Sequence, residues 1–158
     1  MFFSKKTAWG WVGVDRSKIV DEENVLKEHH KKEIDEIIVS RSHAGQVHEI
    51  LQKIYKDKQY KIIPAAGSAY KTIQVLREYA DYYLHITPIK KWDVCAPDAV
   101  LRANYGTMST LHNQTLDYNP QQLLIRDGIL ATYQADHQQI LNFLIERNLT
   151  AYLSAKHS

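Results

Sequence analysis

The sequence predicts an α/β fold, in which helices pack on a sheet, and two observations support this prediction. A short run of apolar, mostly β-branched residues is followed three times by a polar or glycine-containing corner and then by apolar residues at helical spacing. The three units follow one another directly, with no linker between them. Strands that alternate with helices in this way form a sheet covered by helices.

The first segments of the chain are predicted to be a strand and a surface excursion. Residues 7–14, TAWGWVGV, place Ala8, Trp11 and Val14 among small residues, which favours a buried strand. Residues 15–34 are dense in charges of both signs, without an apolar period wide enough to face a core. We therefore predict a charged surface excursion over 15–34, with a short helix over 22–30 and a solvent-exposed His29–His30 pair.

The first two strand–corner–helix units follow this excursion. The first has a strand in DEIIVS that ends at Ser40, and then a helix whose apolar positions are Val47, Ile50, Leu51 and Ile54. The second has a strand over 61–65, a corner over 66–68 and a helix that presents Ala69, Ile73 and Leu76 on one face. Ligands of such sheets bind at the carboxyl ends of the strands, where these corners lie.

A third unit and a closing segment complete the predicted elements. The third unit has a strand over 82–87, a corner over 88–92 and a helix that carries Val94, Val100 and Leu101. TMSTL and TLDY, joined by HNQ, predict a hairpin, and GILAT predicts a further strand. A last helix is expected to bury Ile140, Leu141, Leu144 and Ile145, and the tail after it is expected to fray.

The composition predicts one soluble globular domain. The chain has 158 residues, of which 44% are hydrophobic and 24% are charged, and its formal net charge of +2 does not favour nucleic acid as a partner. Cys95 is the only cysteine, so no internal disulfide can form, and no zinc-type spacing surrounds it. No apolar run is long enough for a membrane helix, and MFFSKK is too short for a secretory signal.

The second corner has the residue types of an anion site. The first backbone N–H groups of a helix lack partners and carry a partial positive charge, so they attract anions. Gly67 allows the backbone to approach a ligand, Ser68 offers a hydroxyl and Lys71 adds a full charge. Phosphate is the ligand that these groups would bind. The alternative is that Ser68 only caps its own helix and Lys71 is solvated.

The first and third corners each offer one further candidate. Asp93 stands near the start of the third helix, where an aspartate is usually an N-cap. Pro97 weakens that interpretation, because it supplies no backbone donor, so we expect a first turn that is distorted or begins later. An outward Asp93 could then hold Mg²⁺, which prefers carboxylates, waters and phosphate oxygens. His43 in the first corner is either a structural hydrogen-bonding group or a member of the same cleft.

The motif KKWDVCAPDAVL resembles a signature of the inositol monophosphatase superfamily, in which Trp-Asp is followed by a small residue and an apolar helix. KKWD and CAP are typical of its 3′(2′),5′-bisphosphate nucleotidase branch. TAW, IIVSRSHAGQV, YLHITPIKKWD and GILAT are similar to the Golgi-resident members of that branch. The resemblance extends from about Phe3 to Leu144 and implies the carboxyl-terminal lobe of this two-lobed phosphatase fold over 1–158.

The resemblance implies a Mg²⁺-dependent, lithium-sensitive phosphatase that converts 3′-phosphoadenosine 5′-phosphate to AMP and phosphate. On matching positions it implies that Asp93 binds metal and that His43, Ser68 and Lys71 line the pocket of the retained nucleotide. His85 falls where some relatives place a basic residue near that pocket. The corner at Ser68 is then expected to hold the retained AMP part rather than the phosphate that is cleaved.

Two departures from the family pattern shape the expectations. The glutamate and the Asp-Pro-x-Asp-Gly/Ala-Thr motif that supply most metal ligands in the family are absent from this sequence, so no catalytic residue is assigned. We therefore expect a fragment without the amino-terminal metal-binding lobe, with little activity alone, that pairs with the missing lobe or with itself. In addition, Tyr105 stands where the family usually has glycine.

Two other functions remain open at this stage. An inositol monophosphate phosphatase would share Asp93 but would make little use of Lys71 or an adenine pocket. A non-catalytic nucleotide-binding module would retain the pocket and lack the chemistry. The resemblance implies the Golgi lumen or membrane for the full-length relative, and we expect neither a signal nor a membrane segment within this chain.

Overall fold

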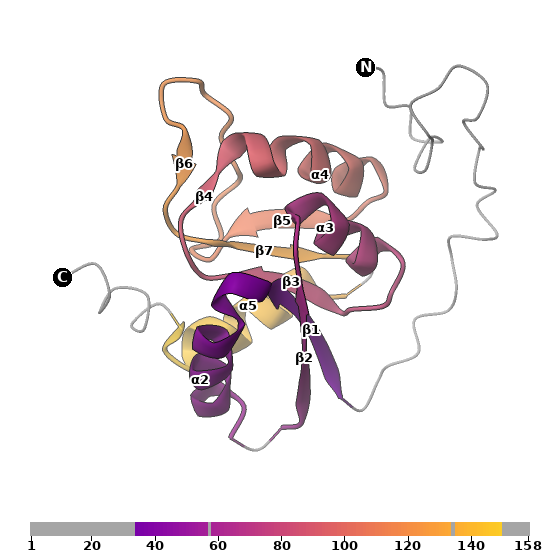
Figure 1. Ribbon diagram of the computed structural model, residues 1–158, viewed down its shortest axis with the longest axis vertical. Helices are drawn as coiled ribbons and strands as arrows, with labels where there is room; N and C mark the ends of the chain where they lie inside the picture. Colours follow the sequence, from indigo (N-terminus) through magenta and orange to yellow (C-terminus); the bar gives the residue numbers. More distant parts are fainter. Residues whose placement is uncertain (1–33, 57, 134, 150–158) are drawn as a thin grey trace.

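The computed structural model describes residues 34–56, 58–133 and 135–149. Within them a five-stranded sheet is covered by helices on both faces (Figure 1), which confirms the predicted α/β class. Three predicted segments lie outside the described residues: the strand over 7–14, the excursion over 15–34 except for its last residue, Ile34, which is exposed, and the tail from Thr150. The helix and the histidine pair predicted within the excursion also lie outside them.

The first unit forms as predicted. Strand β1 (Asp35–Ser40) leads through a short 3-10 turn, η1 (Arg41–His43), into helix α2 (Ala44–Ile54). The β-branched run Ile37–Val39 is fully buried in the sheet. All four predicted inward positions of α2 are buried, namely Val47, Ile50, Leu51 and Ile54.

In the second unit the elements are right, but the predicted helix face is right only in part, since Leu76 is buried and Ile73 is partly buried. Strand β2 (Tyr60–Ala65) is followed by helix α3 (Ser68–Leu76). The buried side of α3 is made by Lys71, Thr72, Val75 and Leu76, whereas Ala69 is exposed. Polar residues can face the sheet because backbone carbonyls satisfy them: Thr72 donates to the Ser68 carbonyl at 3.0 Å and Lys71 to the Gly67 carbonyl at 3.1 Å.

The third unit differs from the prediction at its corner. Strand β3 (Tyr82–His85) ends two residues early, and the expected corner contains strand β4 (Ile89–Lys90), which pairs with β6 (Leu124–Ile125) in a small second sheet. Helix α4 (Lys91–Ala103) begins before Asp93, so its start is not delayed. Of its predicted apolar positions, Val94 and Leu101 are buried and Val100 is partly buried.

The closing segment contains the predicted strand and helix, and of the predicted hairpin it contains only the turn and one antiparallel bridge. GILAT forms β7 (Ile129–Thr132), and α5 (His137–Glu146) buries Leu141 and Leu144. Strand β5 (Thr107–Thr110) pairs with β7, and TLDY meets it only through an isolated bridge to Ser109. Beyond the bridge, Tyr118 donates at 2.8 Å to Asp98, a buried carboxylate on α4.

The sheet has the order β2-β1-β3-β7-β5, and only β7 runs against its neighbours. The carboxyl ends of β1, β2, β3 and β5 therefore meet at one edge. Side chains that alternate along the strands divide the core in two. Ile37 and Leu84 pack towards α2 and α5, while Ile38 and Tyr83 pack towards α3 and α4 (Figure 1).

The start of β7 lies directly against the end of β3. Gly128 has a φ of 64°, and a Cβ atom there would lie 2.2 Å from the carbonyl oxygen of His85. Only glycine fits this close approach. The residue fixes the position of His85 at the carboxyl edge of the sheet.

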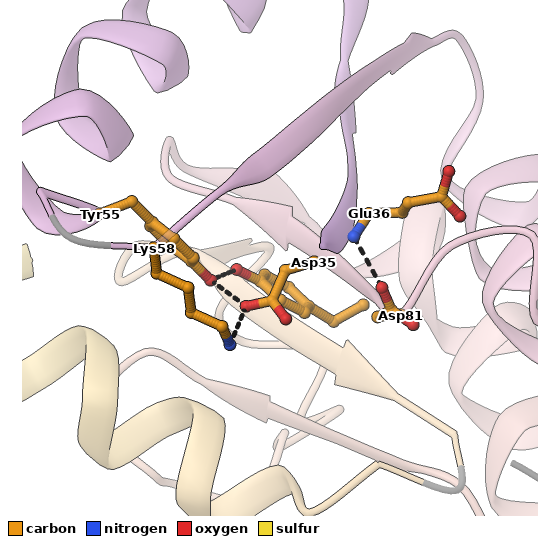
Figure 2. Close-up of polar contacts among 6 residues, drawn as sticks. Asp35, Glu36, Tyr55, Lys58 and Asp81 are labelled. Atoms are coloured by element: carbon orange, nitrogen blue, oxygen red, sulfur yellow. Dashed lines mark hydrogen bonds and ion pairs between the residues drawn. The ribbon is translucent and has the colours of Figure 1, made fainter. Parts of the chain in front are cut away.

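A polar network joins the opposite, amino edge of the sheet (Figure 2). Tyr55 donates to the Asp35 carboxylate at 2.9 Å, and Lys58 contacts the same oxygen at 2.7 Å. Because the Tyr55 proton is given to Asp35, the buried Tyr82 hydroxyl, 2.5 Å away, donates to Tyr55. The network links the chain after α2 to strands β1 and β3.

A second set of bonds at the same edge involves Glu36 and Asp81. The Glu36 amide donates to the Asp81 carboxylate at 2.6 Å (Figure 2), and the Asp81 amide donates to the Glu36 carbonyl at 2.8 Å. The Glu36 carboxylate also pairs with Lys61 of β2 at 2.9 Å. The carboxylates at this edge are therefore committed to holding strands together.

Candidate functional site

The five residues predicted for the site gather at the carboxyl edge of the sheet. His43 follows β1, Ser68 and Lys71 open α3, His85 ends β3 and Asp93 lies in the first turn of α4. The ring centroids of His43 and His85 are 6.0 Å apart, Ser68 bonds to the Asp93 backbone, and the charge of Lys71 acts on both His85 and Asp93. We call these five residues the carboxyl-edge cluster.

Lys71 is held inside the protein rather than in solvent. Its side chain is only 3% exposed, and its ammonium group donates to the Gly67 carbonyl. The ammonium nitrogen also lies 4.8 Å from the centre of the Tyr83 ring. Burial lowers the pKa of Lys71, and the nearby Asp93 carboxylate partly offsets this effect. The solvated alternative for Lys71 is therefore wrong.

The two histidines of the cluster pack edge to face. His85 is buried and its Nε2 lies 3.1 Å from the Thr87 hydroxyl. Burial, with the positive charge of Lys71 next in importance, lowers the pKa of His85 from 6.5 to about 4. His85 is therefore neutral at pH 7 and can serve a ligand as a hydrogen-bonding group rather than as a cation. His43 is half-buried, with its Nδ1 3.0 Å from the Ser42 hydroxyl.

Ser68 does not cap its own helix, and Asp93 does not cap α4. The N-cap positions belong to Gly67 and Lys90. Instead the Ser68 hydroxyl donates to the backbone carbonyl of Asp93. In a regular helix that carbonyl would accept from the amide of residue 97, which is Pro97 and has no N–H. Ser68 thus satisfies the acceptor that the proline leaves without a partner.

The Asp93 carboxylate itself faces outward from the first turn of α4. The partial positive charge of the helix start favours a carboxylate at this position, and exposed carboxylate oxygens can coordinate a cation. Within residues 34–56, 58–133 and 135–149, however, no group of three or more His, Cys, Asp or Glu side chains could hold a metal ion. Asp93 can supply one ligand of a metal site, and the described residues do not complete such a site.

Tyr83 is a member of this region that sequence reasoning missed. Its ring lies close to both Lys71 and His85, with its centroid 6.2 Å from that of His85. The period of two along β3 would have placed it on the same face of the sheet as His85, but its apolar ring suggested only a core position. Its hydroxyl has no hydrogen-bond partner among the described residues.

Two hollows of the surface are formed by other residues. One of about 600 Å³ is formed by the loop and strand over 110–127 together with Lys91. Another of about 350 Å³ lies between β2 and α3 and includes Arg41 and Tyr70. Neither lining contains a residue of the carboxyl-edge cluster, so neither hollow is formed by these five side chains.

Comparison with known proteins shows to which family the chain belongs. The model of the inositol monophosphatase family matches residues 4–146, most of the chain. The chain belongs to the inositol monophosphatase family. This membership confirms the resemblance based on the Trp-Asp motif and its neighbours.

Curated relatives match this family member over only part of their length. The Golgi-resident adenosine 3′,5′-bisphosphate 3′-phosphatase of mouse is 38% identical to it, over 90% of this chain and 39% of the mouse protein. The human protein of the same name is 35% identical, over 95% of this chain and 41% of the human protein. Inositol monophosphatase 3 of zebrafish is 36% identical over 90% of this chain and 41% of its own. The chain spans about 40% of the length of these relatives.

Solved structures of the family share the fold. Inositol monophosphatase II of Staphylococcus aureus superposes with a TM-score of 0.58 at 18% identity, covering 81% of this chain and 47% of that one. CysQ of Bacteroides thetaiotaomicron superposes with a TM-score of 0.58 at 21% identity, covering 71% of this chain and 41% of the CysQ chain. The mixed sheet with its helices therefore corresponds to part of the family fold.

Proposed function

We propose that this chain is the nucleotide-binding lobe of a Mg²⁺-dependent phosphatase that removes the 3′-phosphate of 3′-phosphoadenosine 5′-phosphate and leaves AMP. The observation that carries the proposal is the buried Lys71, which faces His85 and Asp93 at the carboxyl edge of the sheet. A buried ammonium group is costly unless an anion compensates it, and a retained phosphate would do so.

The proposal assigns separate tasks to the cluster. His43, Ser68, Lys71 and His85 line the pocket for the retained nucleotide, with Lys71 as the cation and His85 as a neutral hydrogen-bonding group. Asp93 contributes a single carboxylate to a Mg²⁺ site. A bound Mg²⁺ would supply Lewis-acid chemistry at the phosphate. Because the described residues do not complete a metal site, we expect little turnover by the 158-residue chain.

Two likenesses support the substrate class. Relatives 35–38% identical to the chain are named adenosine 3′,5′-bisphosphate 3′-phosphatases. One structure of the shared fold is described as bound to 2′AMP, and another as complexed with Mg²⁺ and phosphate. We propose that the activity requires an amino-terminal lobe that supplies further carboxylates, or a second copy of the chain. We also propose a Golgi location, from the names of these relatives.

Binding tests the nucleotide site directly. Calorimetry on the 158-residue chain should detect AMP without added Mg²⁺, and binding of adenosine and of inositol monophosphate should be weaker. Lys71→Met, which keeps the length of the apolar stem, should weaken AMP binding. Lys56→Met, at an exposed lysine after α2, should leave it unchanged. Equal affinities for AMP and adenosine would contradict a phosphate-binding role for the cluster.

Turnover tests the catalytic half of the proposal. Phosphate release from 3′-phosphoadenosine 5′-phosphate with Mg²⁺ should be negligible for this chain. In a longer protein that contains it, release should be faster than from inositol monophosphate, should be inhibited by lithium and should be lost in Asp93→Asn. Rapid turnover by the 158 residues alone would overturn the assignment of a shared metal site. Preference for inositol monophosphate would favour the inositol phosphatase alternative.

A non-catalytic module is the second candidate. Asp93 supplies a single carboxylate, and the described residues hold no group of three or more side chains that could bind a metal ion. This observation favours a module without catalysis, and it also limits the phosphatase proposal. This candidate predicts AMP binding that Mg²⁺ does not change, both in this chain and in any longer protein that contains it.

A further inference from the structure

We propose that the Tyr83 hydroxyl is a ligand-binding group of the carboxyl-edge cluster, which donates a hydrogen bond to an anionic oxygen of the molecule that Lys71 attracts. The inference rests on the proposed function, because the ligand class is the phosphate-bearing nucleotide named there. Tyr83 lies in the middle of the sheet, where β3 pairs it with Ile38 on one side and Ala131 on the other.

The first step is the burial of a donor without a partner. Tyr83 is 0% exposed, and its hydroxyl has no hydrogen-bond partner within the described ranges. Buried polar groups in folded proteins almost always have a partner, because an unpaired one loses its hydration without compensation. A hydroxyl of this kind is expected where a ligand supplies the acceptor.

The second step is the contrast with other tyrosines of the same chain. Tyr82, the neighbour of Tyr83 on β3, is equally buried and bonds to the Tyr55 hydroxyl at 2.5 Å. Tyr55 donates to Asp35 and Tyr118 donates to Asp98. The fold thus provides acceptors for its tyrosine hydroxyls on the α2 and α5 face and beside α4. Tyr83 is the exception, and it is the one that lies in the predicted site.

The third step concerns what surrounds Tyr83. The Lys71 ammonium nitrogen lies 4.8 Å from the centre of the Tyr83 ring, and the His85 ring packs against it at an angle of 69°. Burial, and secondarily the Asp93 carboxylate, raise the pKa of Tyr83, so the phenol keeps its proton at neutral pH. The phenol and the ammonium group that lies over its ring are both hydrogen-bond donors, and a phosphate oxygen can accept from either of them.

The test uses Tyr83→Phe in the 158-residue chain. Removal of an unpaired buried hydroxyl should leave the thermal midpoint of the free protein unchanged or raise it. The same substitution should weaken AMP binding, measured by calorimetry, by about tenfold, which is typical for the loss of one hydrogen bond to a charged group. Binding of adenosine, which has no phosphate, should not change. Tyr79→Phe, at a tyrosine that is 63% exposed, is the matched control.

Each result decides for or against the inference. If Tyr83→Phe binds AMP as tightly as the unmodified chain does, the inference fails and the proposed function stands. A clear loss of thermal stability would also overturn it, because the hydroxyl would then have a partner inside the protein. If the unmodified chain binds neither AMP nor inorganic phosphate, both the inference and the nucleotide site of the proposed function fail.

Discussion

The Ser68 hydroxyl donates its hydrogen bond to the backbone carbonyl of Asp93, and this bond joins the first residue of α3 to the first turn of α4. The acceptor is available because Pro97 has no amide hydrogen to offer it. A proline inside a helix and a serine on a neighbouring helix therefore act as one unit. The unit fixes the backbone from which the Asp93 carboxylate projects.

This relationship predicts a coupling between two substitutions. Ser68→Ala should lower the free energy of unfolding by about 1 kcal/mol, the usual contribution of one hydrogen bond. In a Pro97→Ala background the new amide can pair with the Asp93 carbonyl, so Ser68→Ala should then cost much less. Urea unfolding of the four proteins measures the coupling, and Ser68→Thr, which keeps the hydroxyl, is the control. If Ser68→Ala lowered the free energy of unfolding equally in both backgrounds, Ser68 would not be compensating for the missing amide of Pro97.

Tyr105 predicts a stabilising substitution. It follows the last turn of α4 with a φ of 64°, and the amides of Tyr105 and Gly106 donate to the carbonyls of Arg102 and Leu101. This left-handed position suits glycine, as the family pattern has it. Although Tyr105→Gly also adds entropy to the unfolded chain, the relief of strain should leave a gain of about 0.5–1 kcal/mol. Thermal unfolding measures it, and a loss of stability would mean that the 78% exposed ring makes important contacts.

The buried histidines predict acid sensitivity. Because the pKa of His85 is lowered from 6.5 to about 4 in the folded state, the unfolded chain binds the proton first as the pH falls. Stability is therefore full above about pH 6.5 and declines as the pH falls towards 4, by on the order of 3 kcal/mol for this residue. Burial also lowers the pKa of His137, which acts in the same direction.

Unfolding in urea at pH 7.5 and at pH 4.5 checks this decline. His85→Gln should reduce the difference between the two values, because glutamine does not titrate. His48→Gln, at an exposed histidine on α2, should keep the difference unchanged. An unchanged difference in His85→Gln would contradict the role of His85.

Substitution by alanine should have opposite effects on stability at two glycines. Gly128→Ala places a Cβ atom 2.2 Å from the His85 carbonyl oxygen at a φ of 64°, so it should destabilise the fold by more than about 2 kcal/mol. Gly45→Ala, within α2 and with open space around it, should stabilise by about 0.5–1 kcal/mol. Thermal unfolding of both variants compares them. If Gly128→Ala left the thermal stability unchanged, β7 would be able to move away from His85.

The parts of the fold that local patterns determine could be predicted from the sequence. The run Ile37–Val39 and the apolar positions of α2 specified a strand and a helix face through spacing alone. The buried face of α3 could not be predicted in this way. Lys71 and Thr72 face inward because carbonyls at Gly67 and Ser68 accept their hydrogen bonds, and such bonds are invisible to a hydrophobic period.

Errors elsewhere come from contacts between distant residues. The predicted hairpin is reduced to a turn and one bridge, and Tyr118 bonds to Asp98, twenty positions earlier in the chain. The start of α4 was misjudged because Ser68, far from Pro97 in sequence, accommodates the proline. That the site residues meet could be predicted, since parallel strands end at one edge. Their individual roles remain predictions, and the unpaired hydroxyl of Tyr83 could not be foreseen.

The bonds at the amino edge in Figure 2 have a consequence for how a ligand arrives. Asp35, Glu36 and Asp81 place negative charges at one end of the strands, where Lys58 and Lys61 offset two of them. Arg41 and Lys71 place positive charges at the other end, where Asp93 offsets one of them. The sheet is thus electrically polar along its strands. An anion diffusing nearby would be steered towards the positive end, and its association rate should fall as ionic strength rises and screens this field.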